Sequence, residues 1–310
     1  MRRAASFGFS TTLQFMTIAA VGALALIANA AARDRDDDND RRDREKVIYS
    51  SIPRPLPGNV ASVGPEAYAF REVGDGVVFA PGAGGVLDDV RVILSSWGCK
   101  AGHWFSNDCA TPRGAKFNQS ITLNVYAVID IAGIPTRGAL LATKTRTFEI
   151  PYRPSADPAR CPATPGKWFS ERDNVCYNGL AVPIEFDLGD LRVPVPARAI
   201  IGVAYNSTHY GYQPIGEGAP CFTSSGGCPY DSLNVSTDGN GASVGSVIDP
   251  NGIFINYVIT SQYCQPHADQ GNTIQLDTGP NCWTGFHPQI SVESKERRKH
   301  HSRDRDDPRD

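Results

Sequence analysis

The sequence lacks the motifs of the common nucleotide-dependent and zinc-dependent enzymes. It contains no P-loop, no dinucleotide-binding fingerprint, no C-x-x-C pair and no HExxH motif. The string GAGG at 82–85 precedes an apolar run and is typical of a turn. The histidines at 103, 209, 267 and 287 are scattered over different segments, so no zinc site is expected. These absences favour a protein without enzymatic activity.

An excess of positive charge is also absent. The chain has 30 Lys and Arg against 33 Asp and Glu, which gives a formal net charge of −3. Many of these charges lie near the two ends, and segment 47–294 carries fifteen basic and twenty-one acidic residues, a net charge of −6. This balance argues against a nucleic-acid-binding surface and against attraction to anionic lipid.

Long apolar runs are absent apart from one near the start of the chain. Arg2 and Arg3 precede an apolar stretch at 18–27, and small residues follow at 28–32. The stretch is too short to span a bilayer and ends in a cleavage-type site, which is the pattern of a secretory signal peptide over residues 1–32. We expect the signal to be removed, leaving a secreted or periplasmic protein with no transmembrane segment. An uncleaved anchor is the alternative.

Two segments rich in charges of both signs flank the middle of the chain. Residues 33–58 combine RDRDDDNDRRDREK with the proline-rich string PRPLPG, and residues 295–310 read KERRKHHSRDRDDPRD. Neither segment has enough apolar residues to form a core, so both are predicted to be disordered. They are solubilising tails in one interpretation, and in the other they adhere to a wall polymer or a partner.

The middle of the chain has the period of β-strands, and no window keeps the 3.6-residue period of an amphipathic helix. In ITLNVYAVI at 121–129, alternate residues from Ile121 to Ile129 are apolar and would line one face of a strand. This pattern predicts an all-β fold, a two-sheet antiparallel sandwich that is jelly-roll-like, in one domain over 59–294. Further strands are predicted at 76–80, 89–95, 139–150, 180–188, 198–206, 231–235, 252–260 and 288–292.

The eight cysteines fall two at a time in the four longest connections between the predicted strands. Eight cysteines permit about 105 pairings, and the sequence alone does not choose among them. An even count, an export signal and one pair in each loop favour local disulfides over links between loops. The local hypothesis pairs Cys99 with Cys109, Cys161 with Cys176, Cys221 with Cys228, and Cys264 with Cys282.

The first two of these loops look like copies of one motif. CKAGHWFSNDC at 99–109 and CPATPGKWFSERDNVC at 161–176 share Trp-Phe-Ser, and all four tryptophans of the chain lie in the long loops. Trp and Tyr have a flat apolar body and a polar tip, which suits stacking on a sugar ring. Alternatively, each aromatic residue is the buried anchor of its own loop. The candidate ligand-binding residues are Trp104, Phe105, Trp168, Phe169, Tyr210, Tyr212 and Trp283.

Oxygen-rich turns offer a candidate site for calcium. Asp231, Asp238, Asn240, Asp249 and Asn251 lie in or beside turns, where their oxygens could converge on an ion. Asp-Gly and Asn-Gly are equally ordinary turn sequences, and the segment does not fit the EF-hand pattern. The preferred expectation is therefore a protein without a cofactor.

Several strings in the middle of the chain carry a resemblance to other proteins. They are ILSSWGC, ITLNVYAV, TFEIPYRPSADPARC, VCYNGLA, AYNSTHYGYQPIGEGAPC and CPYDSLNVS. Together they resemble a family of secreted bacterial disulfide-containing β-sandwich proteins of uncharacterised role, over about residues 68–292. The resemblance implies export and the sandwich fold, and it supplies no activity, ligand or catalytic residue.

Three functions are consistent with these features. The first is a secreted, non-enzymatic binding or surface-associated module that recognises carbohydrate or cell-envelope polymer through loop aromatics. The second is a purely structural protein of the extracellular space or envelope, in which the tryptophans are buried. The third, a secreted glycan hydrolase, needs two carboxylates that face each other across a cleft. Its candidates are Glu149, Glu171, Glu185 and Glu217, and the oligomeric state is left open.

Overall fold

The structure is a computed structural model that describes residues 45–65, 70–102, 104, 107–205, 233–257, 263, 273–278 and 285–296. Across these residues the protein is built almost entirely from β-strands. Each segment that the sequence predicts to be a strand contains one. The all-β prediction is therefore confirmed.

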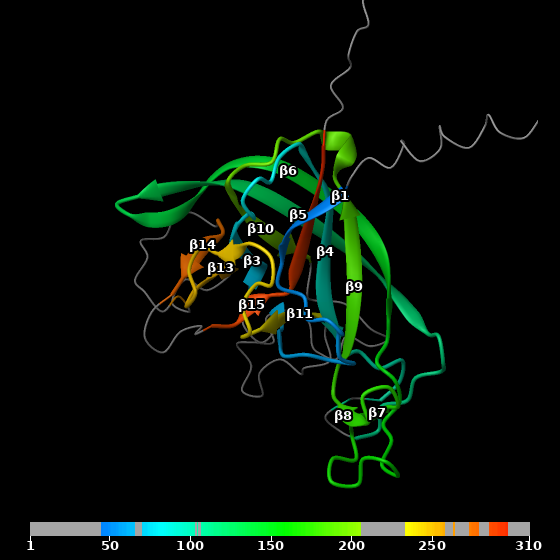
Figure 1. Ribbon diagram of the computed structural model, residues 1–310. Helices are drawn as coiled ribbons and strands as arrows, with labels where there is room; N and C mark the ends of the chain where they lie inside the picture. Colours follow the sequence, from blue (N-terminus) through cyan, green and yellow to red (C-terminus); the bar gives the residue numbers. More distant parts are fainter. Residues whose placement is uncertain are drawn as a thin grey trace, which may run out of the picture. The chain divides into compact units, whose positions relative to one another are not determined.

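Two antiparallel sheets make up the sandwich (Figure 1). Sheet A contains β1 (Glu45–Ser50), β2 (Ser62–Val63), β4 (Val86–Ser96), β9 (Leu180–Asp187), β11 (Leu233–Asp238), β15 (His287–Pro288) and β16 (Ile290–Lys295). Sheet B contains β3 (Phe70–Val78), β5 (Lys116–Ile131), β6 (Ile134–Pro151), β10 (Arg198–Ala204), β12 (Ser246–Val247), β13 (Ile253–Tyr257) and β14 (Gln275–Asp277). A separate small hairpin is formed by β7 (Trp168–Ser170) and β8 (Val175–Tyr177).

The strand order is that of a jelly roll. Sheet A contains the row β2-β11-β4-β9, and sheet B contains the row β3-β10-β5-β6. Along the chain, the strands of these two rows alternate between the sheets except at the β5–β6 hairpin. The alternation buries one face of each sheet against the other. β16 and β1 widen sheet A beside β4, and β13 and β14 widen sheet B beside β3.

The core lies between the sheets and follows the two-residue period. On β5, Ile121, Leu123 and Val125 are buried, while Thr122 and Asn124 between them are only partly buried. Burying one such aliphatic side chain contributes about 1.5–3 kcal/mol relative to leaving it in water. The corresponding core residues of β4 are Val90, Val92 and Leu94.

Two glycines let β3 and β10 approach closely at the centre of sheet B. Gly74 faces Gly202 in the antiparallel register. A Cβ at Gly74 would lie 2.1 Å from a backbone carbonyl oxygen of β10, and one at Gly202 would lie 2.1 Å from Oε1 of Glu72. The Glu72 carboxylate uses this space and accepts hydrogen bonds from Asn124 at 2.9 Å and Tyr126 at 3.1 Å. Burial raises the pKa of Glu72, and these two hydrogen bonds oppose the shift only in part.

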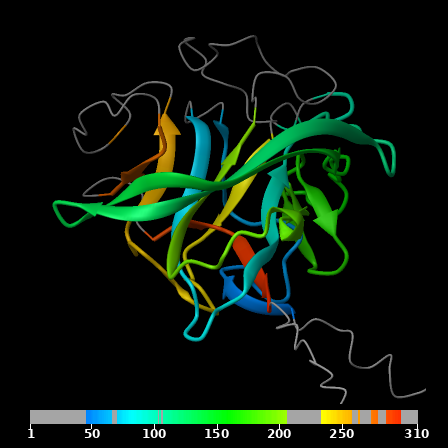
Figure 2. The same cartoon turned by 90° about the horizontal axis from the view of Figure 1, so that it is seen from above.

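The β5–β6 hairpin is longer than the strands beside it, and its tip projects past them (Figures 1 and 2). The two strands pair as far as Ile131 with Ile134, whereas β10 pairs with β5 only between residues 122 and 127. The apolar pattern of β5 therefore continues beyond the sandwich, where apolar side chains become exposed. Ile129, Ile131, Ile134 and Leu140 are between 46% and 54% exposed.

The folded domain begins earlier than the sequence predicts. Disorder is predicted over 33–58, but β1 pairs with β16, and Ile48 and Tyr49 are completely buried. Residues 51–58 then form a strap that lies against the outer face of sheet A. The apolar string VIYS carries the strand signal, and the surrounding charges and prolines obscure it. Residues 33–44 and 297–310 lie outside the described residues.

Candidate functional site

The two loops that share Trp-Phe-Ser lie side by side. A Cβ at Gly166 in the second loop would lie 2.1 Å from the side-chain oxygen of Asn107 in the first. We call residues 97–117 and 151–179 the disulfide lobe. The predicted disulfides Cys99–Cys109 and Cys161–Cys176 are confirmed, and each closes its own loop. The cysteines predicted to form the other two pairs, Cys221, Cys228, Cys264 and Cys282, lie outside the described residues.

Arg153 lies within the disulfide lobe and is completely buried. Its backbone N–H donates to the carbonyl oxygen of Gly98 at 2.9 Å, and its Nη2 donates to the carbonyl oxygen of Gly166 at 2.6 Å. One residue thereby ties both loops to the segment that follows β6. Burial lowers the pKa of Arg153 to about 10, so the guanidinium still carries its charge at neutral pH.

Trp168 is an internal anchor of the second loop. Its Nε1 donates to the carbonyl oxygen of Gly179 at 2.7 Å, and its ring lies 5.5 Å from the ring of Tyr177. A Cβ at Gly58 in the strap would lie 3.0 Å from the edge of the indole. The side chain is 7% exposed, so a ligand could contact little of it in this conformation. Within Trp-Phe-Ser, the residue that solvent reaches is Phe169.

Phe169 is partly exposed, and a cation covers one face of its ring. The guanidinium carbon of Arg160 lies 4.7 Å from the ring centroid, which is a cation–π arrangement. Arg160 is fixed in turn by ion pairs with Asp157 and Glu171. Trp104 in the first loop is also partly exposed, and it packs edge-on against Trp97 with ring centroids 4.9 Å apart. The disulfide lobe therefore combines aromatic surface with a guanidinium that two carboxylates hold in place.

The disulfide lobe differs in net charge from the rest of the domain. The lobe segments contain seven Lys and Arg against four Asp and Glu, whereas segment 47–294 as a whole is acidic. The other predicted ligand-binding residues, Phe105, Tyr210, Tyr212 and Trp283, lie outside the described residues. The structure thus brings together Trp104, Trp168 and Phe169, and the remaining assignments stay predictions.

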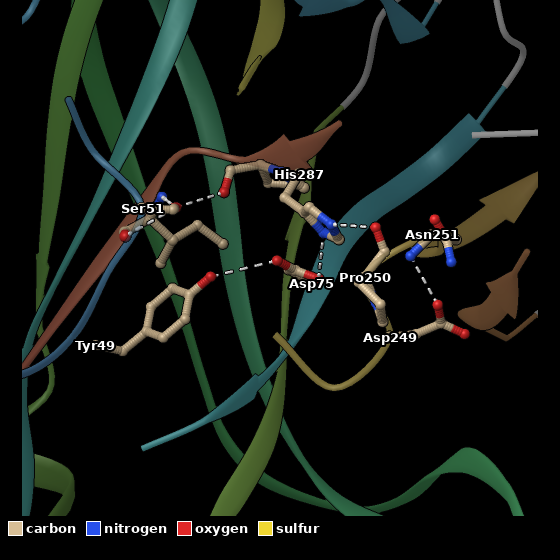
Figure 3. A network of polar contacts seen from close by, with 9 residues as sticks. Tyr49, Ser51, Asp75, Asp249, Pro250, Asn251 and His287 are labelled. Carbon is tan, nitrogen blue, oxygen red and sulfur yellow. Dashed lines mark hydrogen bonds and ion pairs between the residues drawn. The ribbon is translucent and has the colours of Figure 1, made fainter. Parts of the chain in front are cut away.

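A buried polar network joins the two sheets (Figure 3). Asp75 on β3, His287 on β15 and Tyr49 on β1 are each at most 3% exposed. His287 Nδ1 lies 3.3 Å from Asp75 Oδ1, and its Nε2 lies 3.3 Å from the carbonyl oxygen of Pro250. The Tyr49 hydroxyl donates to Asp75 Oδ2 at 3.4 Å. Because both ring nitrogens of His287 face oxygen acceptors, the geometry favours the doubly protonated ring.

The electrostatics of this network agree with its geometry. Burial on its own would lower the pKa of His287, but the hydrogen bond and the charge of Asp75 outweigh burial, and the net shift is upward. Burial raises the pKa of Asp75, and the hydrogen bond from His287 offsets only part of that shift. Solvent does not reach either group, so the pair is a structural element of the fold and not an acid–base pair for a substrate.

Acidic side chains gather where β4 and β9 meet the 3-10 turn η1 (Gly189–Leu191). Burial raises the pKa of Asp89 to about 6, and the charges of Glu185, Asp88 and Asp187 add to the shift. Lys144 neutralises one member of the cluster by pairing with Asp190 at 2.8 Å. The fold therefore holds repulsive negative charge at this position.

The carboxylates considered for glycan hydrolysis are each held in a surface ion pair where the structure describes them. Glu149 pairs with Lys116 at 3.2 Å, Glu185 pairs with Arg91 at 2.5 Å, and Glu171 pairs with Arg160. Glu217 lies outside the described residues. These pairs leave the hydrolase hypothesis without support from geometry.

The candidate calcium ligands are used within their own turns. Asp238 accepts hydrogen bonds from the backbone and side-chain nitrogens of Asn240, and Asp249 accepts one from the backbone N–H of Asn251. These are the local bonds that Asp and Asn make in ordinary turns. Asp231 lies outside the described residues, and within the part of the chain that the structure describes no group of three His, Cys, Asp or Glu side chains is placed to hold a metal ion.

One string in the chain matches the motif of a hydrolase nucleophile. The string GASVG at 241–245 fits the GxSxG pattern of a hydrolase nucleophile, which requires a strand–turn–helix context. Here the Ser243 hydroxyl donates to the carbonyl oxygen of Ser50 at 3.1 Å, and the short strand β12 follows instead of a helix. The serine therefore links two segments of the sandwich, and its context does not fit the nucleophile motif.

Comparisons with protein-family models, with curated proteins and with solved structures find no match. Within the described residues no helix is long and apolar enough to cross a membrane.

Proposed function

We propose that the protein is a secreted binding module that recognises carbohydrate or a cell-envelope polymer through its disulfide lobe. The observation that supports this proposal is the convergence of two disulfide-closed loops, which brings Trp104 and Phe169 from separate loops into one structural unit. Loops that are fixed before binding lose little conformational freedom on binding, and this favours affinity.

The chemistry of the lobe suits such a ligand. An exposed aromatic ring offers an apolar face to the C–H groups of a sugar ring, and the Arg160 guanidinium above Phe169 offers hydrogen-bond donors beside it. The excess of basic residues in the lobe favours polymers that carry negative groups. The signal-peptide pattern and the two disulfides agree with an oxidising compartment outside the cytoplasm.

The test is retention on insoluble polysaccharides. Purified protein is mixed with cellulose, chitin and peptidoglycan, and depletion from solution gives the affinity. We expect Phe169→Ala to weaken retention by about fivefold or more, because an aromatic contact contributes about 1 kcal/mol. The matched control is Phe286→Ala, which removes an aromatic ring that is 45% exposed outside the lobe. If Phe169→Ala and Trp104→Ala are both retained like the wild type while remaining folded, the lobe is not the binding site.

A purely structural role is the second candidate, and the burial of Trp168 favours it. In that case the aromatic residues of the loops serve as anchors, and the lobe is a rigid part of an extracellular assembly. This candidate predicts that the wild-type protein is retained on none of the polymers.

A further inference from the structure

A groove lies between the strap and the outer face of sheet A. Its volume is about 590 Å³, which is within the range of pockets that hold small ligands. None of the residues that line it belongs to the disulfide lobe. The residues that matter for its chemistry are Ser50, Arg54, Leu56, Arg91, Ile93 and Glu185.

The strap is a fixed wall because it is bonded at both ends. At its start, the backbone N–H of Ser51 donates to the carbonyl oxygen of Ile290 at 2.9 Å, and the Ser51 hydroxyl accepts the N–H of the same residue at 2.9 Å. At its end, the N–H of Gly58 donates to Asp173 at 2.6 Å, and its carbonyl oxygen accepts the N–H of Ala181 at 2.8 Å. The groove is therefore formed before any ligand arrives.

An ion pair on the floor offers donors and acceptors together. Arg91 on β4 and Glu185 on β9 are direct cross-strand partners, and Arg91 Nε and Nη2 donate to the same carboxylate oxygen at 3.1 and 2.5 Å. Both side chains are nearly half exposed. Because these two bonds use one oxygen, Nη1 of Arg91 can still donate hydrogen bonds and Oε1 of Glu185 can still accept them. Adjacent hydroxyl groups of a sugar can accept from the first and donate to the second.

The rest of the groove is aliphatic and carries a net positive charge. Pro183 on the floor is exposed and Leu56 on the strap is partly exposed, so their apolar surface suits the C–H face of a sugar ring. Ile93, the cross-strand neighbour of Pro183, is buried. Arg54 lines the groove from the strap, and no carboxylate among the described residues pairs with it. Ser50 also lines the groove, and its hydroxyl oxygen is buried and has no hydrogen-bond partner within the described ranges.

The strap argues against an extended peptide as the ligand. Peptides commonly bind by adding a strand to an exposed backbone edge, which needs N–H donors along that edge. Residues 53, 55 and 57 of the strap are prolines, which have no N–H group. Recognition in the groove therefore falls to side chains.

We infer that this groove binds a saccharide unit that carries a carboxylate, with Arg54 on the carboxylate and the Arg91–Glu185 pair on neighbouring hydroxyl groups. The inference rests on the groove residues alone and does not depend on binding at the disulfide lobe. It therefore adds a second site, with its own ligand class, to the proposed function.

The experiment is calorimetric titration of the full chain with di- and trigalacturonate, and with neutral galactobiose and galactotriose as matched sugars. We expect the acidic sugars to bind and the neutral ones to bind at least about tenfold more weakly, as loss of a charge-assisted hydrogen bond implies. Arg54→Gln should abolish this preference. The control Arg192→Gln, an exposed arginine outside the groove and the lobe, should preserve it. The double variant Arg91→Gln, Glu185→Gln should weaken both sugar types equally.

Several outcomes would overturn the inference. They are equal binding of acidic and neutral sugars, absence of binding, an Arg54→Gln variant that behaves like the wild type, and competition by acetate or inorganic phosphate at the concentrations at which galacturonate binds. Tighter binding of a free dipeptide would also overturn it in favour of a peptide carboxylate. Arg54→Gln must abolish the preference for acidic sugars in the Phe169→Ala background as it does in the wild type, so failure at the lobe and failure at the groove are separate results.

Discussion

Trp168 and Phe169 are neighbours on β7 with different surroundings, and this difference assigns them different roles. Trp168 is buried against the strap and closes the hairpin through its bond to Gly179, whereas Phe169 is partly exposed beneath Arg160. Substitution of Trp168 should therefore mainly lower stability, whereas substitution of Phe169 should mainly weaken binding.

Trp168→Phe should lower the free energy of unfolding by about 1–2 kcal/mol, because the carbonyl oxygen of Gly179 loses its donor while buried. Phe keeps an aromatic ring but is smaller than the buried indole, so a loss of packing beside Gly58 adds to this value. Urea unfolding followed by circular dichroism measures the effect. Phe169→Leu, on the same strand, is the control and should change stability by less than about 0.5 kcal/mol. Equal losses in the two variants would contradict these roles.

The sequence predicts that Trp168 and Phe169 are important, but it does not predict which of them is buried and which is exposed. Trp-Phe-Ser alternates, so its first two side chains point to opposite faces, yet nothing local indicates which face is covered. The cover comes from Gly58, which lies more than 100 residues earlier in the chain. Arg153 illustrates the same limit, because a charged residue in a polar segment gives no local sign that it is completely buried.

At the scale of elements, the disulfide lobe and the sandwich are stabilised by different means. The sandwich is stabilised by apolar burial between its sheets. The second loop instead has the disulfide Cys161–Cys176, across a separation of 15 residues, the buried ring of Trp168, and hydrogen bonds from Arg153 and Gly58. The loop should therefore be able to unfold locally while the sheets stay folded.

Replacing both Cys161 and Cys176 by Ser tests this independence. A disulfide across about 15 residues contributes roughly 3 kcal/mol by restricting the open loop. We expect fast hydrogen exchange over 158–178 in the variant, while β4 and β10 keep the protection of the wild type. Mass spectrometry of peptides from both regions measures it, and the sandwich peptides are the internal control. Loss of protection throughout the sandwich would show that the lobe and the sheets unfold together.

Strands with long alternating patterns can be predicted from the sequence, whereas short strands and strands flanked by charges and prolines cannot. The alternation in β5 identifies its core face without reference to any partner. β1 was missed because four apolar residues stand between a charged run and three prolines, and its stability comes from pairing with β16 at the other end of the chain. The groove was missed for the same reason, since the strap that forms its wall was predicted to be disordered.

At the scale of the whole molecule, four titratable groups have pKa values that are shifted in the same direction. Glu72, Asp75, Asp89 and His287 all have a folded-state pKa above the usual value. A group of this kind contributes stability that is fully present below its unfolded pKa and is lost as the pH rises through its folded pKa. Asp173 has the opposite sign, because the hydrogen bond from Arg172 lowers its pKa to about 2, and its contribution is lost only in strong acid.

These signs predict that the protein is more stable at about pH 5.5 than at about pH 8, by about 1 kcal/mol or more. Urea unfolding at fixed ionic strength across this range measures the change. Asp89→Asn removes a carboxyl group whose pKa is about 6, so this variant should be more stable than the wild type at pH 8 and equal to it near pH 4. Because solvent screens this surface site, the gain should not exceed about 1 kcal/mol.

His287→Asn should flatten the part of the pH profile above about pH 6.5, where the unfolded histidine loses its proton and the folded one retains it beside Asp75. The two variants therefore divide the profile into an acidic part and a neutral part. A wild-type protein that is more stable at pH 8 than at pH 5.5 would show that the buried pair is not protonated as its geometry indicates. An Asp89→Asn variant with an unchanged profile would show that the acidic cluster carries no strain from its charges.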